Sequence, residues 1–150
     1  MRLRDLLDET TVKVGLESVD KEECFEELID VLVQAGRIQD RAGALQAILK
    51  REEDGSTGIG SGVGVPHGKH NSIPELCAAL GTSQEGIEFD AIDGDPVYVV
   101  FLLLARTDQP GHHVQALAEI GRLVGTPGVC RRLKEAESAQ DVLDILDAEE

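Results

Sequence analysis

The chain has 150 residues, and we expect a single domain over residues 1–150, long enough to bury a hydrophobic core. Acidic side chains outnumber basic ones by 29 to 14, and the net charge of −15 disfavours binding to nucleic acid or to an anionic membrane surface. The widely spaced Cys24, Cys77 and Cys130 predict no disulfide framework, and no apolar run could act as a signal peptide or membrane span. We therefore expect a cytoplasmic protein without direct membrane insertion.

Two helices are predicted in the first third of the chain. Asp20 is placed to cap a helix that Gly36 ends, and the intervening apolar residues follow a helical spacing. Asp40 is placed to cap a second helix that ends near Arg51. The apolar residues expected to face the core from this second helix are Leu45, Ile48 and Leu49.

Strands are predicted from the middle of the chain onward. Residues 55–67 contain too much glycine for a helix and predict a loop that becomes a short strand near Val63 and Val65. Residues 76–82 predict a second strand. Residues 97–105 are continuously apolar and rich in β-branched side chains, which is typical of a central strand buried on both faces.

The C-terminal third predicts three helices. The first covers residues 113–124, the second begins at Thr126 with Pro127 in its first turn, and Ser138 caps the third. The residues expected on the inner side of the first are Val114, Leu117, Ile120 and Leu123. Helices and strands therefore alternate, which predicts α/β layers. We expect an α/β fold with a central mixed sheet flanked by helices.

The densest chemical signal is residues 51–67, which read REEDGSTGIGSGVGVPH. Closely spaced glycines let backbone N–H groups approach a ligand, and successive N–H groups can form a cavity for an anion. The segment matches neither the dinucleotide-binding nor the P-loop pattern. Anion binding is therefore favoured over nucleotide binding.

His67 ends this segment directly after Pro66, which restricts the backbone on both sides of it. A neutral imidazole can accept a phosphoryl group, and the guanidinium of Arg51 could neutralise the phosphoryl charge. The alternative is that His67 is structural or merely exposed and that Arg51 is a solvated helix end. The residues by themselves leave both interpretations open.

A metal site is a further alternative. His67 and His70 form an H-x-x-H pattern, and His112 and His113 lie downstream. Zinc sites use closely spaced ligand sets, and two adjacent histidines seldom face the same ion. We therefore expect no metal, although a metal-dependent hydrolase remains a competing hypothesis.

Residues 51–67 closely resemble the signature of the enzyme IIA (EIIA) domains of the phosphoenolpyruvate-dependent phosphotransferase system, in the fructose–mannitol branch that includes nitrogen-regulatory proteins. The resemblance continues through residues 89–97, 100–104 and 113–118 and covers nearly the whole chain. It implies an EIIA type 2 fold and a phosphotransferase component that carries phosphohistidine. Neither a cofactor nor a metal is implied.

The resemblance also implies roles for single residues. His67 matches the phosphorylated histidine, Arg51 the arginine that neutralises the phosphoryl group, and His113 a second histidine that orients or charge-balances the site. The hydroxyl of Thr57 is placed to donate to phosphate. The amides expected to bind phosphate with it are those of Gly58 and Gly60.

The implied partners are a phosphoryl donor, the histidine phosphocarrier protein HPr or its nitrogen-branch relative, and a recipient, a IIB cysteine or a regulated target. Residues 129–138 and 89–93 favour the nitrogen-regulatory type. The alternatives are a fructose- or mannitol-type sugar-transport component and a non-catalytic binding regulator. Three departures from the family pattern are Gly64 in place of a common alanine, Arg106 in place of a frequent proline, and His112 as a second choice for the partner histidine.

Overall fold

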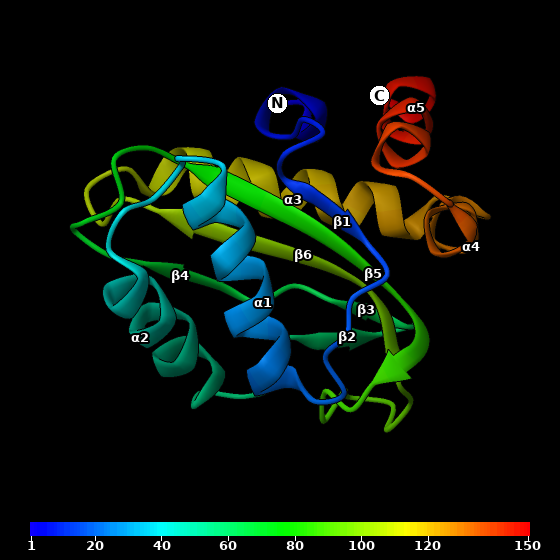
Figure 1. The fold of residues 1–150 in the computed structure, drawn as a ribbon, viewed down its shortest axis with the longest axis horizontal. Helices are drawn as coiled ribbons and strands as arrows, with labels where there is room; N and C mark the ends of the chain where they lie inside the picture. The colour runs from blue at the N-terminus through cyan, green and yellow to red at the C-terminus, as the bar shows by residue number, and fades with distance from the viewer.

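The computed structural model describes residues 1–150 and consists of a mixed β-sheet between two layers of helices (Figure 1). The predicted α/β class is confirmed. The strands are β1 (Val12–Val14), β2 (Gly58–Gly60), β3 (Val63–Gly64), β4 (His67–Lys69), β5 (Cys77–Ile87) and β6 (Val97–Ala105). The helices are the 3-10 helix η1 (Leu3–Leu6) and the α-helices α1 (Lys21–Gln34), α2 (Arg41–Glu52), α3 (Pro110–Gly125), α4 (Val129–Glu135) and α5 (Ala139–Glu149).

The long antiparallel pair β5 and β6 forms the centre of the sheet, whose strand order is β1-β5-β6-β3-β2. Strand β1 runs parallel to β5, and β3 runs parallel to β6 and antiparallel to β2. Strand β4 also pairs with β6 in parallel, opposite residues 103–105. The glycine-rich segment therefore supplies three short strands instead of the single strand expected near Val63 and Val65.

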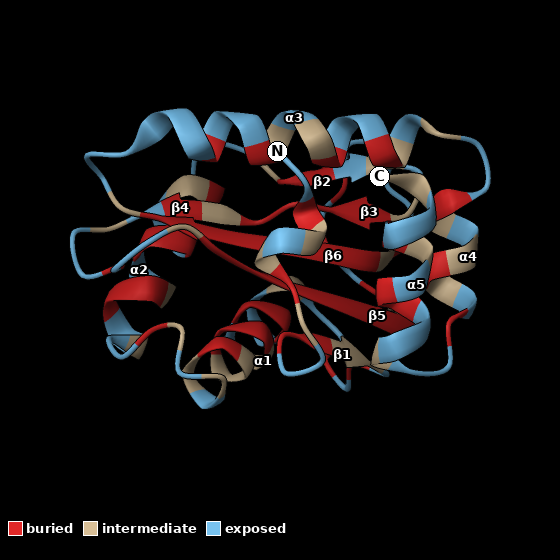
Figure 2. Ribbon diagram, turned by 90° about the horizontal axis from the view of Figure 1, so that it is seen from above, coloured by how far each residue is buried: buried red, intermediate tan, exposed pale blue.

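Strand β6 matches its predicted bounds and is buried on both faces, as its apolar run indicated. Its side chains alternate between two hydrophobic clusters, as successive residues of a strand must. Val99, Phe101 and Leu103 pack toward α3, α4 and α5, whereas Leu102 and Leu104 pack toward α1 and α2. Figure 2 shows the sheet between α3 on one side and α1 and α2 on the other.

The two N-terminal helices begin where their capping residues predict. The Asp20 carboxylate accepts a hydrogen bond from the Glu23 amide, and the Asp40 carboxylate accepts one from the Gly43 amide. These bonds satisfy amides that have no partner inside the helix. The prediction that Leu49 faces the core is wrong, since 36% of its surface is exposed on the outer side of α2.

The first two of the three C-terminal helices differ from prediction at their starts. Helix α3 begins at Pro110, where proline fits the first turn, and not at His113. Val114 is 62% exposed and does not face the core; the helix buries His113 and Ala116 instead. Helix α4 begins at Val129 after Gly128, whose φ of +85° suits glycine, so Pro127 lies outside it.

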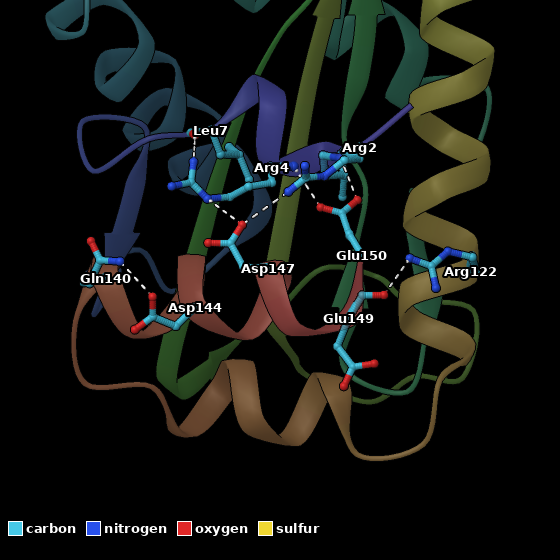
Figure 3. Close-up of polar contacts among 10 residues, drawn as sticks. Arg2, Arg4, Leu7, Arg122, Gln140, Asp144, Asp147, Glu149 and Glu150 are labelled. Carbon is cyan, nitrogen blue, oxygen red and sulfur yellow. Dashed lines mark hydrogen bonds and ion pairs between the residues drawn. The ribbon is translucent and has the colours of Figure 1, made fainter.

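The two ends of the chain lie side by side (Figures 1 and 3). The Leu3 and Arg4 amides donate to the carboxylate of Glu150 at 2.7 and 2.9 Å, and Arg4 Nε lies 3.2 Å from the Asp147 carboxylate. These contacts hold η1 against α5. None of the helices combines the length and the apolar character that a membrane crossing would need.

Candidate active site

His67 is the first residue of β4, where backbone pairing with β6 opposite Leu103 fixes its position. Its Nδ1 lies 2.8 Å from the carbonyl oxygen of Val65. A carbonyl only accepts hydrogen bonds, so Nδ1 must carry the proton and donate it. The neutral ring therefore keeps its lone pair on Nε2, the nitrogen that remains available as a nucleophile.

His113, in the first turns of α3, lies against His67. The two ring centroids are 5.2 Å apart and the planes meet at 72°. His113 is only 3% exposed, and its Nδ1 has no hydrogen-bond partner. Burial, with smaller contributions from His67 and Lys69, lowers the pKa of His113 to about 4.

The environment also keeps His67 neutral. Burial lowers its pKa, the hydrogen bond to Val65 opposes that shift, and the Arg51 cation lowers the pKa further. Both imidazoles are therefore uncharged at neutral pH. Two uncharged rings in contact avoid the repulsion that two imidazolium ions would suffer.

Arg51 lies in the last turn of α2, where its Nη1 donates to the Gly55 carbonyl at 3.1 Å. Two hollows of about 520 and 310 Å³ adjoin His67, and Arg51 lines both. The larger also contains His113 and two further cations, Lys50 and Lys69. The structure thus brings three of the predicted residues together and adds two lysines that the sequence analysis missed.

A sequence signal for one of these lysines was present. Lys69 stands two residues after His67, and residues i and i+2 of a strand point to the same face. Neither lysine forms an ion pair, although the chain carries a net charge of −15. The hollow therefore gathers three cations around one carboxylate, that of Asp54, and this excess of positive charge suits an anionic ligand.

Thr57 lies in the smaller hollow, but its hydroxyl donates to Glu52 at 2.8 Å and its amide donates to the same carboxylate at 3.0 Å. Glu52 is buried at the end of α2 and was not singled out from the sequence. Its carboxylate joins α2 to the start of β2. The hydroxyl proton that the resemblance assigned to phosphate is thus already donated inside the protein.

Gly58 and Gly60 belong to the β2–β3 hairpin and line neither hollow at His67. A Cβ atom on Gly58 would lie 2.8 Å from Ala91, so the position requires close backbone approach. Gly60 has φ +96°, which glycine tolerates best. In the structure these glycines shape the hairpin that leads to His67.

The four histidines do not converge. His70 contacts Ser72 through its Nδ1 at 2.6 Å, and His112 lines a separate hollow beside Met1. No three His, Cys, Asp or Glu side chains are placed to share a metal ion. The geometry also separates the two neighbouring histidines of α3, since His113 and not His112 contacts His67.

Comparison with known proteins identifies the family. Residues 5–149 match the family described as "Phosphoenolpyruvate-dependent sugar phosphotransferase system, EIIA 2". The chain belongs to the EIIA type 2 family. EIIA domains are phosphotransferase components that carry phosphohistidine.

Relatives of this EIIA domain include both sugar-specific and nitrogen-regulatory proteins. It is 40% identical over 126 residues to the fructose-specific EIIA component of Haloferax volcanii, covering 84% of this chain and 82% of the relative. It is 36% identical to the fructose-specific EIIABC component of Bacillus subtilis over 97% of this chain, but spans only 23% of that longer protein. Identity to a nitrogen regulatory protein of Bradyrhizobium diazoefficiens is 30%, over 97% of this chain and 95% of the relative.

The solved structures that superimpose on this chain include a nitrogen-regulatory and a mannitol IIA protein. The nitrogen regulatory protein IIA-Ntr of Neisseria meningitidis superimposes with a TM-score of 0.88 at 29% identity, over 96% of this chain and 98% of the other. The mannitol IIA of Escherichia coli, in a complex with phosphorylated IIB, superimposes with a TM-score of 0.81 at 23% identity, over 95% and 97%. The second likeness shows the shared fold, a mixed sheet flanked by helices.

Proposed function

We propose that His67 is the phosphoryl-accepting residue of this EIIA domain and that Nε2 is the atom that attacks. The observation that carries this proposal is the hydrogen bond from His67 Nδ1 to the Val65 carbonyl. It fixes the tautomer whose lone pair is on Nε2, and it holds the ring without involving that atom. The lowered pKa of His67 keeps this nucleophile unprotonated at neutral pH.

The charges around His67 support the same proposal. Phosphoryl transfer depends mainly on positioning and on neutralising the charge of the transferred group. Arg51, Lys50 and Lys69 line the hollow beside His67 and supply this charge. The unpartnered Nδ1 of the buried His113 supports a role in which that ring gains a partner when the phosphoryl group is present.

Each transfer step exchanges one bond to phosphorus for another and uses no cofactor. Nε2 of His67 forms a bond to the incoming phosphorus atom, and the phosphorus–nitrogen bond in the donor's phosphohistidine breaks. The donor nitrogen leaves with the electron pair. Where the group is passed on to a IIB domain, a cysteine thiolate forms the new bond to phosphorus, and Nε2 leaves with its electron pair.

Protein partners fit the surface around the pocket. Ile59 is 45% exposed, Ile92 is 79% exposed and Val114 is 62% exposed, and each lines a hollow that contains His67. Large apolar side chains exposed around a charged centre are typical of a protein interface. We propose HPr, or its nitrogen-branch relative, as the donor.

Two uses of the carried phosphoryl group each have support. Regulation by phosphorylation state is supported by the IIA-Ntr superposition and by the full-length likeness to a nitrogen regulatory protein. Sugar transport through a IIB cysteine is supported by the identities of 36% and 40% to fructose-specific components. We propose the regulatory use, which residues 129–138 also favour, and keep sugar transport as the second candidate.

The first experiment is intact-mass measurement after incubation with phosphoenolpyruvate, enzyme I and HPr, or with their nitrogen-branch relatives. We expect one acid-labile phosphoryl adduct on the wild type and on His70→Ala, and none on His67→Ala. An adduct that persists in His67→Ala would overturn the assignment. Absence from the wild type, with donors active on a control EIIA domain, would exclude these donors.

The second experiment separates the two uses. Phosphorylated protein is mixed with IIB domains from fructose and mannitol systems, and loss of the adduct is followed over time. Rapid transfer to a IIB cysteine would support sugar transport. Failure with every IIB domain, alongside normal phosphorylation of His67, would support regulation.

A further inference from the structure

Most Lys and Arg side chains of this acidic chain form ion pairs. The basic side chains without such a partner are Lys50, Arg51, Lys69, Arg131 and Lys134. The first three line the hollow at His67. The other two lie together in a second pocket, which has no part in the phosphoryl transfer proposed above.

This second pocket has a volume of about 550 Å³, within the range of small-molecule sites. Ser61 and Gly62 of the β2–β3 turn, Asp95 and Tyr98 near the start of β6, and residues of α4 form its wall. Figure 2 shows α4 and β4 at opposite ends of the sheet, so the pocket is well separated from His67.

The two cations of the pocket are held on one side of α4. Arg131 and Lys134 are three residues apart, and side chains at this spacing lie on the same face of a helix. Lys134 is half-buried, and its Nζ lies 3.7 Å from the centroid of the Tyr98 ring. This cation–π contact positions the ammonium group without neutralising it, which leaves its charge available to an anion.

The remaining lining narrows the chemistry of the ligand. The Asp95 carboxylate forms no ion pair and can accept hydrogen bonds from hydroxyl groups. The ring of Tyr98, with Pro96, offers apolar surface for the carbon skeleton of a ligand. A purely anionic ligand would be repelled by Asp95, whereas a ligand with both an anionic group and hydroxyl groups satisfies both sides of the pocket.

We propose that this pocket binds a sugar phosphate, a phosphomonoester of a small polyhydroxy compound. Arg131 and Lys134 contact its phosphate, and Asp95 accepts hydrogen bonds from its hydroxyl groups. A nucleic-acid phosphate is disfavoured here because the rest of the surface is acidic. The proposal does not depend on phosphorylation of His67 and is tested on the unphosphorylated protein.

Cys130 provides a reporter inside the pocket. It lines the pocket and is partly accessible, whereas Cys24 and Cys77 are buried. The rate at which iodoacetamide alkylates Cys130 is measured by peptide mass spectrometry with increasing glucose 6-phosphate. Glucose and inorganic phosphate, the two halves of this probe, serve as comparisons. We expect glucose 6-phosphate to slow alkylation, glucose to have no effect, and inorganic phosphate to act only at much higher concentration.

A pair of double variants locates the site. Arg131→Gln with Lys134→Gln should raise the concentration needed for protection by roughly tenfold or more, because two charge-assisted contacts are lost. Lys50→Gln with Lys69→Gln removes the same charge from the hollow at His67 and should leave protection unchanged. Thermal unfolding checks that both variants fold.

Several outcomes would overturn the proposal. Protection that is lost in the second double variant and kept in the first would place the anion at His67. Equal protection by inorganic phosphate and glucose 6-phosphate would show a general anion site without recognition of hydroxyls. No protection at millimolar glucose 6-phosphate, together with unchanged amide resonances of Gly62 and Tyr98 in the wild type, would refute binding altogether.

Discussion

The neighbouring imidazoles of the half-buried His67 and the buried His113 show how a residue's environment sets its chemistry. His67 keeps its Nδ1 proton through the Val65 carbonyl, while His113 has no partner for its Nδ1. The Nδ1 atom of His67 thus has a hydrogen-bond partner, whereas His113 carries the free-energy penalty of a buried polar atom without one. The penalty would be larger for an imidazolium ion in the same place.

His113 makes the stability of the fold depend on pH. Its pKa of about 4 lies below the value of about 6.5 for an unfolded histidine. As the pH is lowered, the unfolded chain therefore binds a proton at this residue before the folded chain does. The contribution of His113 to the free energy of unfolding is fully present above pH ~6.5 and is lost as the pH drops toward ~4. We expect His113 to account for a loss of about 2–3 kcal/mol over that window.

His113→Gln removes this titration, so its free energy of unfolding should vary less between pH ~6.5 and ~4 than that of the wild type. Urea denaturation at a series of pH values measures the slope. His112→Gln, at the exposed neighbouring position, is the matched control and should keep the wild-type slope. Parallel profiles for His113→Gln and wild type would show that folding does not shift the pKa of His113.

Arg51 acts on His67 through its charge. Removing the cation in Arg51→Gln should raise the pKa of His67, because the cation lowers that pKa in the wild type. The phosphorylation rate should fall by about tenfold or more, since one charge-assisted contact to phosphate is lost. Ring proton NMR titration measures the pKa, and rapid-quench kinetics measures the rate.

Arg51→Lys is the informative comparison. A lysine at this position keeps the charge but loses the planar fork. We expect it to preserve most of the pKa shift of His67 while losing part of the phosphorylation rate. If Arg51→Gln changed neither quantity, Lys50 and Lys69 alone would be sufficient to offset the phosphoryl charge.

The docking of β4 against α2 is the element-scale feature that positions His67. A Cβ atom on Gly68 would lie 2.8 Å from the backbone of Ala47 in α2, a contact that no side-chain rotation can relieve. Gly68→Ala should therefore destabilise the fold by about 2–3 kcal/mol and slow phosphorylation of the neighbouring His67. Thermal unfolding and the intact-mass assay measure the two effects.

Gly121→Ala also adds one methyl group, but it should change the stability of the fold in the opposite direction. Gly121 lies within α3, and a Cβ there would meet nothing within 4 Å. Alanine forms helix more readily than glycine, so this variant should be stabilised by about 0.5–1 kcal/mol. Equal destabilisation of both variants would mean that the close approach of β4 and α2 is not what limits Gly68.

Element prediction from sequence succeeded where the signal was local. The caps at Asp20, Asp40 and Ser138 and the apolar run of β6 are each written in a few adjacent residues, and each was confirmed. The start of α3 was placed too late because Pro110 was not considered as a first-turn residue. The three short strands of the glycine-rich segment depend on pairing with β6, which residues distant in sequence provide.

At the scale of the whole molecule, part of the site could likewise be predicted from the sequence and part could not. His67, Arg51 and His113 come from three separate elements. The family resemblance predicted that they share one site, and they lie around one hollow in the structure. The engagement of Thr57 with Glu52 escaped the sequence analysis, because a hydroxyl near a glycine loop gives no sign of its partner. Likewise, a net charge of −15 does not reveal which cations remain without a carboxylate.

Two ion pairs between the chain ends, Arg4–Asp147 and Arg2–Asp147, should differ in how much they contribute to stability. Arg4 is 28% exposed, its Nε lies 3.2 Å from Asp147, and its Nη1 donates to the Leu7 carbonyl at 2.7 Å (Figure 3). Arg2 contacts the same Asp147 at 3.4 Å but is 51% exposed. Solvent screening makes exposed pairs weak, whereas a partly buried guanidinium that also donates to a carbonyl contributes more.

Arg4→Gln should therefore lower the free energy of unfolding by about 1–2 kcal/mol, and Arg2→Gln by less than about 0.5 kcal/mol. A double-mutant cycle with Asp147→Asn, followed by urea denaturation, isolates the pairwise energy between residues 4 and 147. Coupling should be larger for Arg4 than for Arg2 and should persist in moderate salt, because partly buried pairs are screened less. Equal coupling for both arginines, abolished by salt, would mean that η1 is held against α5 by its apolar packing and the Glu150 contacts alone.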